Sequence, residues 1–215
     1  MMMISHVNHL FFRSVYGALN VTRDAYGRTL SQHPLLTQMS TSGCLWGLGD
    51  LATQHIEERQ QQQRRDEGID WRRTWNQTVY AALIWGPMGH AWYPMLDRFV
   101  RRLAFLETSQ CYRRVALKYC VEAFLHDPIS LAVYFSTVGY LGGESWTQIC
   151  AQMKRDYVPT LALGFVYWAP LDILNFAIVP VRHQLLMVNF GCFLDSVVLS
   201  HIKKNGFDWR SFIGQ

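Results

Sequence analysis

The sequence predicts an all-α protein, a polytopic integral membrane bundle of about four transmembrane helices with a fifth, short C-terminal or interfacial helix. Half of the 215 residues are hydrophobic and only 17% are charged, whereas about a quarter of the residues in typical soluble domains are charged. Several mostly apolar stretches, interrupted by a few polar residues, are each long enough to cross a bilayer, which takes about 20 helical residues. The chain also holds eight tryptophans, a residue type enriched at membrane–water interfaces.

The alternative is a soluble all-α bundle, because no stretch is an uninterrupted apolar run of about twenty residues. Against this alternative, the four main stretches look apolar on all sides rather than amphipathic. The five cysteines are scattered without a Cys-x-x-Cys pair, so they predict neither a disulfide framework nor a zinc site.

The chain is divided into an N-terminal extension (residues 1–25), a helical membrane domain (residues 26–204) and a C-terminal tail (residues 205–215). The extension has apolar residues at helical spacing, two arginines, and no acid before Asp24. A basic, amphipathic and acid-poor N-terminus is typical of a mitochondrial targeting segment. The alternative for these residues is a surface helix or a disordered tail.

The first stretch, residues 34–56, is weakly hydrophobic and contains Gly43 and Gly47 ahead of Asp50. Small residues four apart let helix backbones approach closely in lipid, so we expect a tightly packed, inward face; a buried helix of a soluble bundle is the alternative. Residues 57–73 are charged and rich in glutamine, which predicts a solvated loop or a helix extension rather than a site. Their acids nearly balance their arginines, which argues against nucleic-acid binding.

The second stretch, residues 75–97, carries His90 at membrane depth. Lipid hydrocarbon penalises an unpaired ionisable group by at least about 2.5 kcal/mol, so this helix must pack with others around something polar. Gly86 and Pro87 predict a packing kink, and Asp97 marks the exit into water.

Three further apolar stretches follow, and each contains one acid. They are residues 115–141 with Glu122, residues 157–179 with Asp172, and the short residues 184–200 with Asp195. His126, Asp127 and Pro128 interrupt the first of them. Because a residue before proline avoids the α region, both two half-helices and one kinked helix fit this pattern. Pro180 ends the second, and the short stretch is either a further span or a buried or interfacial helix.

The basic residues predict an orientation. With four spans, the N-terminus, the second loop and the C-terminal part share one side, and that side holds 13 of the 20 Lys and Arg residues. The positive-inside rule then places both termini inward, in the matrix or the cytosol.

The ionisable residues within these stretches are the candidate functional residues, because an ionisable group inside a membrane is a functional hypothesis by default. As pore-lining or inter-helix polar residues we select Asp50, His90, Glu122, Asp172 and Asp195. The alternative for each is a cap, pair or hydrogen bond that holds helices together. For helix packing or kinks we select Gly43, Gly47, Gly86, Pro87, Pro128 and Pro180. No serine elbow, phosphate loop or metal-ligand spacing is present in the sequence, so we expect no enzymatic activity, cofactor or metal.

A series of residues between Tyr26 and Lys204 also follows a family pattern in order and spacing. The matching residues are Tyr26, Leu30, His33, Pro34, Gly47, Gly49, Asp50, Gln54, Arg73, Thr74, Gly86, Pro87, His90, Leu96, Lys118, Pro128, Asp156, Tyr157, Val179, Pro180, Leu199 and Ser200, together with the signature residues Trp92, Tyr93, Asp97, Trp168, Asn175 and Phe176. In these residues the chain resembles the Mpv-seventeen and peroxisomal membrane protein family of small four-span organelle proteins.

The chain departs from that family pattern mainly by adding acids. Glu122 and Ala123 stand where the family has Asp-Gln, Asp172 replaces a glutamine, and Asp195 replaces a tryptophan. These departures mark what is particular to this chain.

The resemblance implies a multi-pass protein of the mitochondrial inner membrane, with the peroxisomal membrane as the alternative. It implies a channel or pore for small solutes that contributes to mitochondrial metabolite or nucleotide homeostasis; the alternative is a non-conducting membrane scaffold or partner protein. The expected partners are the lipid bilayer, small anionic metabolites and further copies of the chain, and no nucleic acid.

Overall fold

A computed structural model describes residues 24–60, 68–103 and 111–205, and within these residues it contains helices and no strands. The all-α prediction is therefore confirmed. The elements are α2 (Pro34–Gln60), α3 (Trp71–Tyr80), η1 (Ala81–Trp85), α4 (Gly86–Arg102), α5 (Cys111–Val121), η2 (Glu122–His126), α6 (Asp127–Gly142), α7 (Trp146–Ile178) and α8 (Val181–Asn205). Residues 24–32 are also helical, and residues 1–23 of the predicted targeting segment lie outside the described part of the chain.

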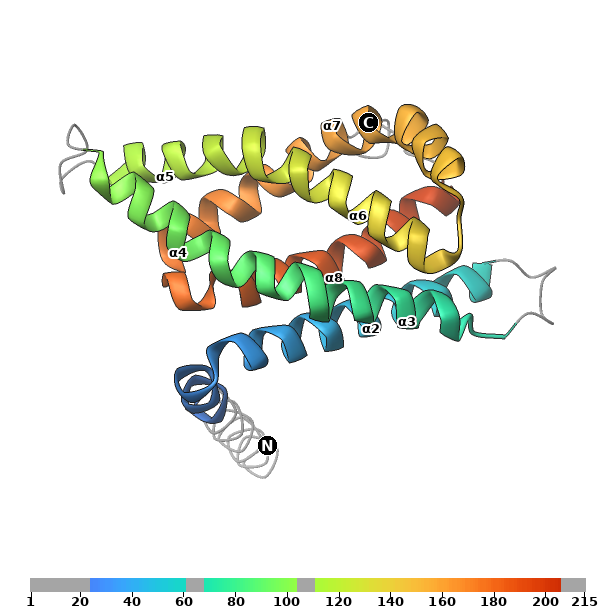
Figure 1. Ribbon diagram of the computed structural model, residues 1–215, viewed down its shortest axis with the longest axis horizontal. Helices are drawn as coiled ribbons and strands as arrows, with labels where there is room; N and C mark the ends of the chain where they lie inside the picture. The colour runs from blue at the N-terminus through green and yellow to red at the C-terminus, as the bar shows by residue number, and fades with distance from the viewer. Residues whose placement is uncertain (1–23, 61–67, 104–110, 206–215) are drawn as a thin grey trace, which may run out of the picture.

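The helices form long rods that lie roughly side by side (Figure 1). α3, η1 and α4 continue into one another as one rod, and α5, η2 and α6 form a second. α2 packs along α8, and α4 contacts both α8 and α5. α7 packs against α5 and α6. The short C-terminal helix expected at residues 184–200 is instead the 25-residue α8, which is a main packing partner of α2.

Both composite rods contain a π-helical turn just before a proline. η1 ends at Trp85, and Pro87 follows in the first turn of α4. η2 ends at His126, and Pro128 follows in the first turn of α6. A proline has no N–H for the i−4 carbonyl and its ring collides with that carbonyl. A wider i→i+5 turn avoids both problems, so the kink predicted at Pro87 is accommodated within a continuous rod, and residues 115–141 form one continuous helical run rather than two half-helices.

Local signals set the ends of α6 and α7. Gly143 terminates α6 with φ +84°, a left-handed conformation that favours glycine. Ser145 then caps α7: its backbone N–H donates to Gln148 Oε1 at 2.7 Å, and its Oγ accepts from the Gln148 backbone N–H at 3.4 Å. This reciprocal capping box satisfies free donors at the start of the helix. α7 consequently begins well before the predicted residue 157 and ends at Ile178, next to Pro180 as expected.

Small residues allow α2 to approach the rod of α3, η1 and α4 closely. A Cβ on Gly43 would lie 3.1 Å from the Ala82 Cβ, and one on Gly47 would lie 2.5 Å from Thr78 Oγ1. Gly86 faces the α2 backbone itself, since its Cβ would lie 3.0 Å from the Met39 Cα. Glycine at these positions is therefore required by the spacing of the helices.

The interior of the bundle is unusually polar and its exterior unusually apolar. Among the described residues, fifteen buried side chains are polar or charged and twelve are hydrophobic. Large apolar side chains such as Val166 on α7, 76% exposed, face outward. This distribution suits lipid, which neither drives apolar groups inward nor solvates polar groups. α4 differs from its prediction, because its buried residues repeat every three or four positions and define one inward face.

One helix of the described chain, α7, is long and apolar enough to cross a bilayer by length and composition. The other rods are interrupted by the polar residues of the interior.

Candidate functional site

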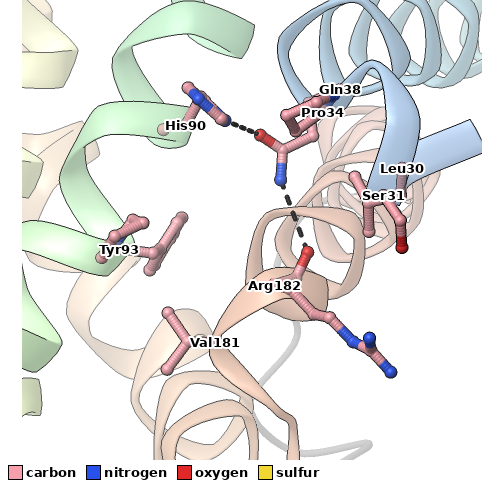
Figure 2. Close-up of a pocket in the computed structure, with 10 residues that line it drawn as sticks. Leu30, Ser31, Pro34, Gln38, His90, Tyr93, Val181 and Arg182 are labelled. Carbon is pink, nitrogen blue, oxygen red and sulfur yellow. Dashed lines mark hydrogen bonds between the residues drawn. The ribbon is translucent and has the colours of Figure 1, made fainter. Parts of the chain in front are cut away.

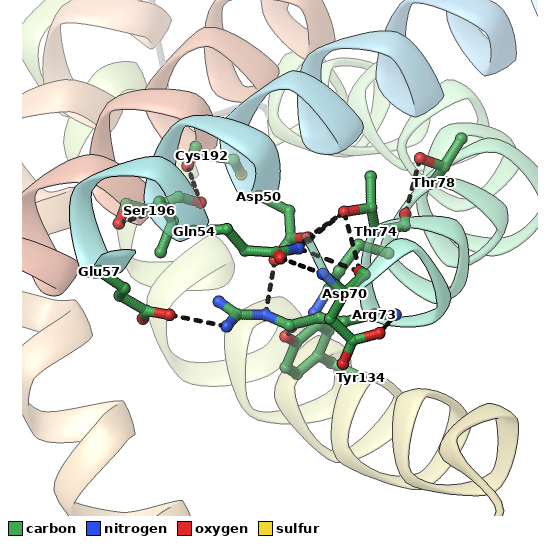
Figure 3. Close-up of polar contacts among 12 residues, drawn as sticks. Asp50, Gln54, Glu57, Asp70, Arg73, Thr74, Thr78, Tyr134, Cys192 and Ser196 are labelled. Atoms are coloured by element: carbon green, nitrogen blue, oxygen red, sulfur yellow. Dashed lines mark hydrogen bonds and ion pairs between the residues drawn. The ribbon is translucent and has the colours of Figure 1, made fainter. Parts of the chain in front are cut away.

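The first buried polar group joins α2 to α3 and is called here the hairpin cluster (Figure 3). Asp50, 6% exposed, accepts a hydrogen bond from Thr74 Oγ1 at 2.6 Å and pairs with Arg73 Nε at 2.8 Å. Gln54 Nε2 donates to the same carboxylate at 2.7 Å. The Asp50 carboxylate is thus neutralised and fully engaged in joining two helices.

The residues between the helices complete the hairpin cluster. Gln54 Oε1 accepts from the Asp70 backbone N–H at 2.7 Å, and Asp70 caps α3 by accepting from the Arg73 N–H at 3.0 Å. Arg73 also pairs with Glu57 at 2.9 Å. Residues 57–73 were expected to form a solvated loop or helix extension without a site. Arg73, in the described part of this segment, is instead the ion-pair partner of the buried Asp50.

His90 belongs to a separate group at the start of α2, called here the Gln38 pocket (Figure 2). His90 Nδ1 and Gln38 Oε1 are 2.6 Å apart, and Gln38 Nε2 donates to the Arg182 carbonyl at 3.4 Å. A cavity of about 170 Å³ opens beside them, lined mainly by apolar groups and by Tyr93 and Ser31. These contacts join α2, α4 and the α7–α8 turn.

A third group links α2, η1 and α8. The Trp85 indole N–H donates to Asn189 Oδ1 at 2.9 Å, and Asn189 Nδ2 donates to Ser42 Oγ at 2.7 Å. Asn189 and Ser42 have no exposed surface. Buried amides and hydroxyls with their hydrogen bonds satisfied fix the relative position of helices, so this group is structural.

The fourth group contains the densest set of ionisable residues and is called the central acid cluster: Glu122, His126, Asp127 and Asp172. His126 Nδ1 lies 3.1 Å from Glu122 Oε1 and 3.8 Å from Asp127 Oδ1. Asp172 on α7 is 4% exposed and interacts electrostatically with the other three. In the described part of the chain, no hydrogen bond or ion pair reaches the Asp172 carboxylate.

The π turn η2 is what brings three of these residues together. Glu122 and His126 are one turn apart, as they would be in an α-helix. Asp127, five residues after Glu122, would lie about 140° away around a regular α-helix. In η2 the Asp127 N–H instead bonds to the Glu122 carbonyl, an i→i+5 closure that stacks residue i+5 over residue i.

Aromatic side chains of α4 enclose the central acid cluster. The Trp92 ring stacks on the His126 ring, with centroids 4.5 Å apart and planes at 20°. The Trp92 indole N–H also donates to Glu122 Oε2, and the Tyr93 hydroxyl donates to Glu122 Oε1 at 3.3 Å. Tyr93 is 2% exposed. The signature pair Trp92 and Tyr93 therefore binds the acid of α5–α6 as well as packing the core.

The nearby lysine is occupied elsewhere. Lys118, one helical turn before Glu122, pairs with Asp97 of α4 at 2.6 Å, and Asp97 also pairs with Arg101 at 2.7 Å. Asp97, expected as an interface anchor, thus joins α4 to α5. Three carboxylates of the central acid cluster face one imidazole without this ammonium.

The structure brings two of the five candidate polar residues together, Glu122 and Asp172, and both are departures from the family pattern. Asp50 lies in the hairpin cluster and His90 in the Gln38 pocket. Asp195 is half-buried on α8, apart from the cluster. His126 and Asp127 were read only as helix interruptions; the Glu-x-x-x-His spacing before an Asp-Pro was the available signal. The remaining signature residues also pack inside, with Trp168 against Gly191 and Asn175 donating to the Gln184 carbonyl at 3.4 Å.

A helical bundle with a polar interior, an apolar exterior and buried ionisable clusters defines a helical membrane protein. Comparison with known proteins identifies its family. The model of the Mpv17 / PMP22 family matches residues 139–200. The chain is 30% identical to human "Mitochondrial inner membrane protein Mpv17" over 164 residues, which cover 76% of this chain and 87% of that protein. The chain belongs to the Mpv17 / PMP22 family.

Two other relatives are similar over most of the chain, and the name of one of them gives the peroxisomal membrane. Yeast (Saccharomyces cerevisiae) "Protein SYM1" is 28% identical over 82% of this chain and 87% of its own length. Bovine (Bos taurus) "Peroxisomal membrane protein 2" is 26% identical over 76% of this chain and 80% of its own length. No solved structure matches the chain. The predicted localisation, the mitochondrial inner membrane with the peroxisomal membrane as alternative, is confirmed at the level of these relatives.

Proposed function

We propose that the chain forms a multi-span channel or pore for small solutes in an organelle membrane, contributing to mitochondrial metabolite or nucleotide homeostasis. One observation carries this proposal: the central acid cluster is buried inside a bundle whose outer surface is apolar. Ionisable groups at membrane depth are costly and mark solute or ion pathways. The helices of the hairpin cluster, by contrast, hold an acid that is already paired.

Four spans are proposed from helix length. α2 has 27 residues, α7 has 33, and each composite rod is longer than α2, whereas about 20 residues cross the hydrocarbon. Three of the four fall short of a plain apolar span because their inward faces carry the polar clusters. The termini are proposed to face the matrix or cytosol, following the distribution of basic residues.

The solute is proposed to be cationic or neutral at the central acid cluster. Carboxylates repel anions strongly where the effective dielectric constant is low, and Glu122, Asp127 and Asp172 carry three of them. Binding of anionic metabolites, expected from the sequence, remains a prediction. It applies to the His90 side of the bundle, because no comparable group of acids lies there, among the described residues, to repel an anion.

The test is a conductance measurement on the purified full-length chain in planar bilayers under a salt gradient. The reversal potential reports cation selectivity, and Asp172→Asn is expected to shift it toward zero. Asp156→Asn is the matched control, because Asp156 pairs with Arg155 at 2.8 Å on an exposed surface. No conductance above that of empty bilayers, or equal reversal potentials for all three chains, contradicts the proposal.

A non-conducting scaffold or partner protein is the second candidate. It is favoured by the ion pairs of Asp50 and Asp97, which show that membrane-depth acids in this chain also serve helix packing. The scaffold hypothesis requires a stable stoichiometric complex on native gels and no change in solute flux when the chain is removed. We expect no enzymatic activity on either reading.

A further inference from the structure

The central acid cluster has the donor spacing of a metal site. The ligand atoms of Glu122, His126 and Asp127 all lie within 4.8 Å of one another. His126 Nδ1 is 3.1 Å from Glu122 Oε1 and 3.8 Å from Asp127 Oδ1. Around a tetrahedral zinc ion with metal–ligand bonds of about 2.1 Å, neighbouring ligand atoms are about 3.4 Å apart. The two observed separations bracket that edge length, so only small side-chain adjustments are needed.

Asp172 supplies an independent reason to expect a ligand. Its side chain is 4% exposed, and within the described residues it has no hydrogen-bond or ion-pair partner. Its electrostatic interactions are with Glu122, Asp127 and His126. A buried carboxylate without a partner is strongly unfavourable, and a cation bound by the other three residues would provide a nearby opposite charge.

The surroundings resemble the outer shell of a metal site. Ser130 Oγ donates to the His126 carbonyl at 2.7 Å and lies 3.3–3.4 Å from both nitrogens of the His126 ring, so it packs against the ring. Glu122 Oε2 accepts from the Trp92 indole N–H. The Tyr93 hydroxyl donates to Glu122 Oε1. These contacts orient the imidazole and the carboxylate before any cation binds.

Charge balance points the same way. Even a protonated His126 neutralises only one of three carboxylates, and Lys118 is held by Asp97. We propose that the central acid cluster binds one divalent cation through His126 Nδ1 and the carboxylates of Glu122 and Asp127, and that the negative charge of the nearby Asp172 strengthens the binding. The cation site lies in the same cluster as the proposed solute pathway, but cation binding requires neither conduction nor a particular number of spans.

The donors select the class of cation. Imidazole nitrogen suits zinc and other first-row transition metals, and carboxylates suit manganese and magnesium. A donor set of one imidazole nitrogen and two carboxylates therefore fits Zn²⁺ or Mn²⁺ better than calcium, which prefers all-oxygen sites, or soft metals, which prefer thiolates.

The test is zinc binding to the purified full-length chain in detergent, after removal of metals with a chelator. Stoichiometry is measured by elemental analysis and affinity by titration calorimetry. We expect Glu122→Gln and Asp172→Asn to bind one zinc ion fewer per chain than the unmodified protein, or to bind that ion at least tenfold more weakly. Asp195→Asn is the control, as a half-buried acid on α8 that is not part of the cluster, and is expected to bind normally. Any zinc bound by cysteines is present in every variant, so it does not affect the difference in zinc content between the unmodified chain and a variant.

A second readout covers variants that fold poorly. Zinc is expected to raise the thermal unfolding temperature of the unmodified chain, since a ligand that binds only the folded state stabilises it, and to raise that of Asp172→Asn less. Equal zinc content in the unmodified chain and Glu122→Gln, together with no zinc-dependent rise in that temperature, overturns the proposal; the carboxylates are then neutralised by protons. Binding is measured without flux, so this result and a failure of the conductance test are distinguishable.

Discussion

Replacing Arg73 by methionine should destabilise the bundle more than any substitution of an exposed basic residue. Methionine keeps most of the aliphatic length and removes the guanidinium that lies 2.8 Å from Asp50. Asp50 would then be a buried carboxylate held only by the neutral donors Thr74 and Gln54. Removing one partner of a buried ion pair costs about 3–5 kcal/mol. The Arg73 side chain is 39% exposed, so solvent screening reduces this, and we expect about 2 kcal/mol.

The assay is thermal unfolding of the purified protein in detergent, followed by intrinsic tryptophan fluorescence. For a chain of this size, about 1 kcal/mol corresponds to about 2–4 °C in Tm, so Arg73→Met should lower Tm by about 4–8 °C. Asp50→Asn, added to that variant, should restore part of the loss, because it removes the unpaired charge.

The comparison variant is Arg155→Met, whose guanidinium pairs with Asp156 on an exposed surface; we expect no measurable change in its Tm. The reasoning is refuted if Arg73→Met behaves like Arg155→Met, or if the effects of Asp50→Asn and Arg73→Met simply add.

Three further predictions use the same unfolding assay. Gly86→Ala should lower Tm relative to Gly142→Ala, because a Cβ at Gly86 would lie 3.0 Å from an α2 backbone atom, whereas a Cβ at Gly142 meets nothing within 4 Å. Overpacking at Gly86 costs about 1–3 kcal/mol. Both variants gain about 1 kcal/mol in helix propensity. Lys118→Met should cost about 2 kcal/mol, less than the about 3–5 kcal/mol for a buried carboxylate left without any partner, because Asp97 keeps its ion pair with Arg101; a Tm equal to that of the unmodified chain would contradict the ion pair with Lys118. Trp92→Phe keeps an aromatic ring over His126 but removes the N–H that Glu122 accepts, and should cost about 1–3 kcal/mol; an unchanged Tm would show that this hydrogen bond is not formed.

Helix positions could be predicted from the sequence because apolar stretches and prolines mark them. The stretch at residues 34–56 corresponds to α2, which extends to Gln60. The start of α7 was placed too late, because the residues after Trp146 are polar and only the Ser145–Gln148 capping box shows where the helix begins. Apolarity reports which part of a helix meets lipid or core, whereas capping reports where the backbone becomes helical.

The candidate acids could be selected from sequence, but their partners could not. Asp50 and Arg73 are 23 positions apart, and their ion pair exists only because Gln54 and Asp70 fold the connection back on α2. Asp172 joins Glu122 only where α7 crosses the α5–α6 rod. Contacts of this kind depend on how the helices cross in space, and the spacing of residues along the sequence does not determine that crossing.

The two π turns explain the position of the central acid cluster. Each π turn accommodates a proline, and their last residues meet in space, with the ring centroids of Trp85 and His126 5.8 Å apart. The wide turn before Pro128 stacks Asp127 over Glu122, and aromatic side chains of α4, which follows the other wide turn, cover the cluster. π turns inside helices occur frequently at functional sites. Glu122 and Asp172, two acids that the sequence predicts to be departures from the family pattern, belong to this cluster, where the backbone already departs from a regular α-helix.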